Sequence, residues 1–159
     1  MEFEKAGYSV YDIAAWFIQR NKQEEENGSE KITLLKLLKL LYYAEGCSLA
    51  LNNKSLFNDD IVAWEHGPVV SGVYYTYNSD PYNLVLTDEQ IKRLNNISSD
   101  DQKLLEDVFD VFGQYSAWAL RNKTHNEKPW LEATKHGQKL KGKIDRNTMK
   151  QYFSDNYID

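Results

Sequence analysis

The side chains that could take part in catalysis are few in this sequence, and His66 is the first of them. It precedes Gly67 and Pro68, where the pattern predicts that a helix begins. The positive end of a helix dipole would disfavour a protonated imidazole, so His66 could serve as a neutral general base. The alternative is a histidine that hydrogen-bonds to loop backbone beside Trp64, and we favour it because perturbed groups are often structural.

A second histidine, His125, lies between Thr124 and Glu127. Imidazole and carboxylate groups form a common metal-ligand set and can also act as an acid and a base. However, residues two apart diverge on a helix, and the sequence has no HExxH motif or paired CxxC motifs to complete a metal site. We therefore expect capping and packing against Pro129 and Trp130, and no metal or other cofactor.

Cys47 is the only cysteine, so no internal disulfide can form and the chain suits a reducing compartment. It lies in the middle of an apolar helical pattern, which predicts a buried and unreactive thiol. The glycine-rich phosphate-binding motifs and the GxSxG motif of serine hydrolases are also missing. We therefore expect a protein that is not an enzyme. A metal-dependent hydrolase that uses His66 and His125 is the remaining enzymatic alternative.

Length and charge limit the class of protein further. With 159 residues the chain can bury a core as one domain, and its net charge of -5 argues against a general nucleic-acid surface. The basic stretch 135–150 is the exception and leaves a nucleic-acid-binding regulator as an alternative. The longest apolar run is interrupted by Lys39 and is too short to span a membrane. We therefore expect a soluble, cytoplasmic protein that does not contact membranes.

Hydrophobic spacing predicts a mainly α-helical, compact single domain with a long buried central helix. That helix should cover residues 34–51, with Thr33 as its N-cap and Asn52 and Asn53 at its end. A first helix is expected over 10–22, and 56–64 is expected to be a short extended segment or part of a hairpin. Further helix starts or ends are predicted at Pro68, Thr87, Ser99, Gly113, Ser116, Pro129 and Asp145.

The central helix has one narrow polar face. Lys36, Lys39 and Tyr43 share it at helical spacing, so we expect these side chains to reach solvent or a partner. Tyr75 lies off the apolar face of the next predicted helix, and Tyr82 follows in a loop. Exposed tyrosines are common anchors of protein interfaces, which makes these five residues candidate partner-binding residues.

Several separated motifs together resemble the Panacea domain, which occurs in Soc-type antitoxins and in phage-associated GepA-like proteins. The resemblance covers about residues 8–153. We expect residues 1–159 to form a single domain of this type. Leu38 and Glu45 depart from it, since the family pattern prefers glutamine at both positions. The motifs are Lys36-Leu37, Lys39 to Ala44, Phe57, Ala63-Trp64, His66 to Val69, Tyr74, Thr124-His125, Pro129-Trp130, Ile144 and Tyr152-Phe153.

The resemblance implies a binding protein that neutralises a cognate toxin by direct contact, in a toxin–antitoxin or defence system of a bacterium or phage. It brings no catalytic residues and no cofactor. Nucleic acid is a disfavoured partner, and the oligomeric state stays open. We interpret the following family-motif residues as structural: Tyr42, Trp64, His66, Gly67, Pro68, His125, Pro129 and Trp130.

Overall fold

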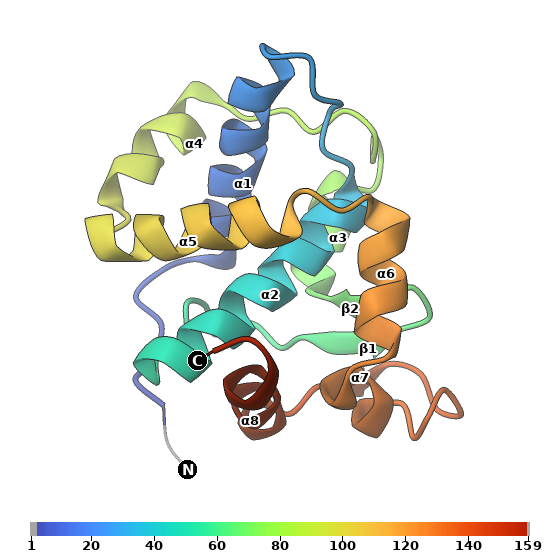
Figure 1. The fold of residues 1–159 in the computed structure, drawn as a ribbon. Coiled ribbons are helices and arrows are strands. Elements are labelled where there is room, and N and C mark those ends of the chain that lie inside the picture. Colours follow the sequence, from blue (N-terminus) through green and yellow to red (C-terminus); the bar gives the residue numbers. More distant parts are fainter. Residues whose placement is uncertain (1–2, 159) are drawn as a thin grey trace.

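Helix α2 (Leu34–Asn52) runs through the middle of the fold in the computed structural model, which describes residues 3–158 (Figure 1). Helices α1 (Val10–Glu25), α5 (Ser99–Phe112), α6 (Ala117–His125) and α8 (Arg146–Asn156) pack against it. Helices apolar on nearly all sides are stable only when they are enclosed in this way. The predicted mainly helical fold with a long buried central helix is confirmed.

The ends of α2 follow the predicted capping chemistry. The Thr33 hydroxyl accepts a hydrogen bond from the Lys36 backbone N–H over 3.2 Å. Asn53 has a left-handed backbone with φ of 50°, as expected of an asparagine that ends a helix. Helix α1 continues to Glu25, three residues beyond its predicted end.

A small antiparallel sheet lies beside α2 and consists of β1 (Val62–Trp64), β2 (Gly67–Val69) and β3 (Gly142–Lys143) in the order β2-β1-β3. The predicted helix start at Gly67-Pro68 is therefore wrong. Pro68 instead pairs with Ala63 in an edge strand, a position where a missing N–H is tolerated. The β1–β2 hairpin agrees with the short extended segment or hairpin expected from residues 56–64. Strand β3 is too short for the sequence pattern to indicate it.

The remaining helices are α3 (Ser71–Tyr77), α4 (Asp88–Arg93), the 3-10 turn η1 (Leu94–Asn96) and α7 (Lys128–Ala133). The predicted capping box of Thr87 and Gln90 is present. Helix α5 is capped by Ser98 rather than by Ser99, because the Ser98 hydroxyl accepts from the Asp101 N–H. Ser116 caps α6 as predicted, and α8 begins next to Asp145 as predicted, with Asp145 as its N-cap.

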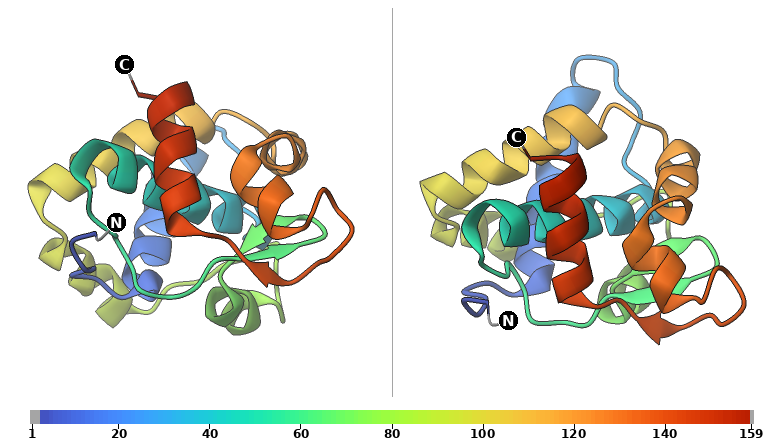
Figure 2. Two further views of the ribbon diagram at one scale, coloured as in Figure 1. Left: turned by 90° about the horizontal axis from the view of Figure 1, so that it is seen from below. Right: turned by 60° about the horizontal axis from the view of Figure 1, so that its bottom comes forward.

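Figure 2 shows α8 (red) lying across α2, with α6 and α7 (orange) to one side of it. The last helix thus covers one side of the central helix. Among residues 3–158, no helix combines the length and the hydropathy that a membrane crossing requires.

Candidate functional site

An apolar groove of about 390 Å³ lies between the start of α2, the β1–β2 hairpin and α3. The loop before β3 forms its remaining side. Because the groove is open to solvent and mostly apolar, it suits a partner's side chains better than a small polar substrate. We name it the hairpin groove, and it is lined by Leu34, Leu35, Leu38, Lys39, Trp64, Glu65, His66, Val69, Tyr74, Pro81, Leu140 and Lys141.

Aromatic rings form one wall of the hairpin groove. The Trp64 ring meets the Tyr74 ring edge-on with their centroids 4.9 Å apart, and Tyr75 packs against both rings. The Trp64 carbonyl oxygen accepts a hydrogen bond from the Trp130 indole N–H over 3.0 Å, which fixes the strand that carries the wall. Tyr75 remains 66% exposed, so its ring reaches solvent beside this wall.

The second predicted tyrosine, Tyr82, lies in the loop after α3 and is 74% exposed. It follows Pro81, which lines the groove and whose carbonyl oxygen accepts from the Leu34 N–H over 2.8 Å. This bond ties the loop to the first turn of α2. Tyr75 and Tyr82 are therefore both next to residues that line the same groove.

Lys39 is fully buried, so the expectation that it reaches solvent is wrong. Its ammonium donates to the Pro68 carbonyl oxygen over 3.0 Å, and the hairpin turn covers its side chain. A Cβ on Gly67 would come 2.7 Å from the Lys39 Cε atom. Burial, and then the positive charge of Arg121, lower the pKa of Lys39 to about 7. The hairpin, which is remote in sequence, thus covers the middle residue of the polar face of α2.

Tyr43 is also fully buried, which corrects its predicted exposure. Its ring stacks on Phe112 with the centroids 4.0 Å apart, and its hydroxyl donates to Glu127 over 3.2 Å. Lys36, the third residue of the predicted face, is half-buried and donates to the Gly113 carbonyl oxygen over 2.5 Å. Of the five candidate partner-binding residues, only Tyr75 and Tyr82 are exposed.

Glu127 lies at the centre of a buried cluster of tyrosines. Tyr42 donates to its carboxylate over 3.0 Å, and Tyr43 and Tyr157 donate to its second oxygen. Burial raises the pKa of Glu127, while these hydrogen bonds act in the opposite direction. Hydrogen bonds inside the protein thus occupy the carboxylate. Among the described residues, no three histidine, cysteine or acidic side chains are placed to hold a metal ion.

The two histidines singled out from the sequence lie in different surroundings. His66 is exposed in the turn between β1 and β2, with its ring 5.9 Å from that of Trp118, so it does not precede a helix. The His125 ring stacks on Trp130 at 3.9 Å, which is the packing role expected of it. Cys47 is buried as predicted, and burial raises the pKa of its thiol to about 12.

A buried ion pair, which sequence patterns do not indicate, joins α8 to α2. The Arg146 Nε atom lies 2.6 Å from a Glu45 carboxylate oxygen, and Ser55 donates to the same oxygen. The other oxygen accepts from the Leu56 N–H over 2.7 Å. Glu45 and Arg146 are 101 positions apart, so no local spacing could have revealed the pair.

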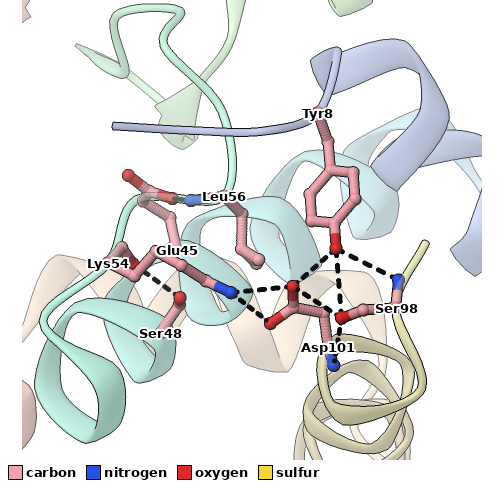
Figure 3. A network of polar contacts seen from close by, with 7 residues as sticks. All are labelled: Tyr8, Glu45, Ser48, Lys54, Leu56, Ser98 and Asp101. Atoms are coloured by element: carbon pink, nitrogen blue, oxygen red, sulfur yellow. Dashed lines mark hydrogen bonds and ion pairs between the residues drawn. The ribbon is translucent and has the colours of Figure 1, made fainter. Parts of the chain in front are cut away.

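A second network holds the segment before α1 at Tyr8. Figure 3 shows Lys54, Tyr8 and Ser98 converging on the buried Asp101 carboxylate, with the Lys54 ammonium 2.8 Å and the Tyr8 hydroxyl 2.6 Å away. Burial would raise the pKa of Asp101, but these hydrogen bonds prevail and lower it. This network joins α5 to the segments before α1 and after α2, and it lies apart from the residues that line the hairpin groove.

Comparison with known families gives a match over the middle of the chain. The family described as "Antitoxin SocA-like, Panacea domain" matches residues 37–131, which is more than half of the chain. The matched segment contains most of α2, the hairpin, and Trp64, His66 and Tyr74 of the groove, whereas Leu140 and Lys141 lie beyond it. Neither the curated proteins nor the solved structures give a match.

Proposed function

Because the chain belongs to the family of SocA-like antitoxins with a Panacea domain, we propose that it neutralises a cognate toxin by binding it directly. The observation that carries this proposal is the hairpin groove. Its aromatic wall lies in the family-matched segment, and Tyr75 beside it is 66% exposed.

The groove supplies the features that a protein partner needs. Leu38, Val69 and Tyr74 offer an apolar lining for an inserted side chain, and burial of apolar surface is the main source of binding free energy. Tyr75 and Tyr82 add large amphipathic side chains of the type found at energetic centres of interfaces. A stable complex would bury about 1,600 Å² in total, so the toxin must also cover surface around the groove.

Neutralisation in this way is stoichiometric and requires no bond to be made or broken. The toxin's active surface would be covered, or the toxin would be held in an inactive conformation, for as long as the complex persists. The amount of toxin that is neutralised then depends on how much of it is bound, so growth protection should depend on the ratio of the two proteins.

The test uses the reading frame that neighbours the gene for this chain. Its product is expressed alone to measure growth arrest, and then together with this chain at matched levels. We expect arrest alone, restored growth on co-expression, and one complex of fixed stoichiometry by size-exclusion chromatography with light scattering. Persistent arrest, or restored growth without any complex between the purified proteins, would contradict direct neutralisation.

A further inference from the structure

The loop between α7 and β3 is basic, although the whole chain has a net charge of -5. Lys135, His136, Lys139 and Lys141 are all exposed in it, and residues 134–143 contain no acidic side chain. Within the described part of the chain, Lys141 has no acidic side chain within ion-pair distance. By contrast, Lys143 pairs with Asp60 over 3.1 Å.

This loop has an unusual backbone. Lys135, His136 and Lys141 adopt positive φ angles of 49°, 59° and 73°, a region that side chains with a Cβ rarely occupy. Each such residue costs about 1 kcal/mol or more and persists only where surrounding bonds enforce it. The Lys141 N–H donates to the Ala63 carbonyl oxygen over 2.7 Å, and the His136 N–H donates to that of Leu131 over 2.8 Å. Lys141 is therefore held in place at a conformational cost.

Lys141, which this loop holds in place, lies at the hairpin groove. Lys141 and its neighbour Leu140 line the hairpin groove, together with Trp64 of the aromatic wall. An apolar surface and an unpaired cation thus belong to one groove. Such a surface is complementary to a segment in which an apolar side chain is followed or preceded by a carboxylate.

We propose that the toxin enters the hairpin groove with an apolar side chain next to an aspartate or glutamate, whose carboxylate pairs with Lys141. This inference rests on the proposed function and specifies the chemistry of the partner. The apolar side chain packs against Trp64 and Leu38. The carboxylate fixes its orientation and excludes partners that bring a positive charge to the same position.

The surroundings favour a protein over a nucleic acid as the partner. Phosphate-binding surfaces gather cations over an extended area, whereas the lining of the groove is mainly apolar and includes the acidic Glu65. Of the two lysines in the lining, Lys39 is fully buried and Lys141 is exposed. A single exposed lysine at the edge of an apolar groove selects one carboxylate rather than a phosphate backbone.

Lys135 is a matched control for Lys141. Both are exposed lysines with left-handed backbones in the same loop, but only Lys141 lines the groove. We expect Lys141→Glu to raise the Kd for the purified toxin about 10-fold or more, because like charges at an interface repel. Lys135→Glu should change this Kd less than about 2-fold. Lys141→Gly relieves the backbone cost, so it should keep or raise the Tm while still weakening the binding of the toxin.

Charge exchange then tests the direct contact. Each aspartate and glutamate of the toxin is replaced in turn by lysine, and Kd is measured by titration calorimetry against the wild-type chain and the Lys141→Glu variant. We expect one toxin variant to bind Lys141→Glu more tightly than the wild-type chain. If no toxin variant does so, the proposed pairing is overturned.

The outcomes separate this inference from the proposed function. If the wild-type chain binds the toxin and Lys141→Glu binds it equally well, the inference fails and the function stands. The inference also fails if Lys135→Glu weakens binding as much as Lys141→Glu does. If the wild-type chain does not bind the toxin, both fail. A low-salt gel shift of a 30-base-pair DNA duplex that Lys141→Glu abolishes would assign the loop to nucleic acid and overturn the inference.

Discussion

The Lys39 ammonium donates to the Pro68 carbonyl oxygen over 3.0 Å, which joins the central helix to the edge strand of the hairpin. The Lys39 side chain is fully buried, so its ammonium group, which has three N–H donors, must find acceptors inside the protein. The Pro68 carbonyl oxygen is such an acceptor. Because β2 also contains Val69, which lines the hairpin groove, this bond helps to hold one side of the groove in place. The protonation of Lys39 is thereby linked to the stability of the hairpin.

Replacement of Lys39 by methionine should change how stability depends on pH. The pKa of Lys39 is about 7 in the folded protein, against an ordinary value of 10.5. The unfolded chain therefore binds more protons between these values, so the stability of the wild-type protein relative to Lys39→Met should rise from pH 7 to pH 10. The full change could approach about 5 kcal/mol. Urea unfolding of both proteins at intervals from pH 6 to pH 10 measures it.

The comparison with Lys39→Met removes the contributions of other groups that titrate in the same range. Below pH 7 Lys39 is protonated in both states, so the difference in unfolding free energy between the two proteins should become constant there. A difference that does not vary between pH 7 and pH 10 would show that burial does not depress the pKa of Lys39.

Gly67→Ala should destabilise the protein more than Gly137→Ala does. Both glycines have positive φ angles, 112° and 87°, so alanine is strained at either position. At Gly67 the new Cβ would also lie 2.7 Å from Lys39 Cε and 2.9 Å from Thr124 Oγ1, whereas nothing lies within 4 Å at Gly137. We expect a loss of about 1–2 kcal/mol for Gly137→Ala and a clearly larger loss for Gly67→Ala. Equal losses of unfolding free energy would contradict the close packing of the hairpin over Lys39.

The buried pair of Glu45 and Arg146 should couple α2 to α8. Arg146→Met leaves the Glu45 carboxylate buried without its cation and should cost about 3–5 kcal/mol of unfolding free energy. Glu45→Gln keeps the shape of the side chain but removes its charge. The double variant should therefore be more stable than the sum of the two single effects predicts. Urea unfolding of all four proteins gives the coupling, and additive losses would show that the pair contributes no specific interaction.

Features determined within a few residues were predictable from the sequence. The caps at Thr33 and Asn53 and the capping box of Thr87 and Gln90 are examples, since donor and acceptor lie within one turn. The helix start predicted at Pro68 is wrong because proline suits both a first helical turn and an edge strand. Pairing with β1 decides between the two, and the local pattern does not contain that information.

The same limit applies to the candidate site. Lys36, Lys39 and Tyr43 do follow one face of α2, but the spacing cannot reveal what covers that face. The hairpin covers Lys39, and Tyr43 stacks on Phe112 of α5. The exposure of Tyr75 and Tyr82 was predictable because both lie outside the apolar pattern of α3. Their position beside a groove depends on tertiary contacts.

Tyr75→Ala should weaken toxin binding while the fold is preserved. Tyr75 is 66% exposed and packs on the Trp64 ring, so its loss removes contact surface without opening the core. Truncation of an aromatic anchor commonly costs about 2 kcal/mol, which corresponds to about a 30-fold rise in Kd.

Tyr82→Ala should act in the same direction. Tyr115→Ala is the matched control, because Tyr115 is 40% exposed and its chain neighbours, unlike those of Tyr75 and Tyr82, do not line the groove. Toxin titrations, with circular dichroism to confirm helical content, measure the effect. Unchanged binding by both Tyr75→Ala and Tyr82→Ala, or an equal loss with Tyr115→Ala, would place the toxin on another surface.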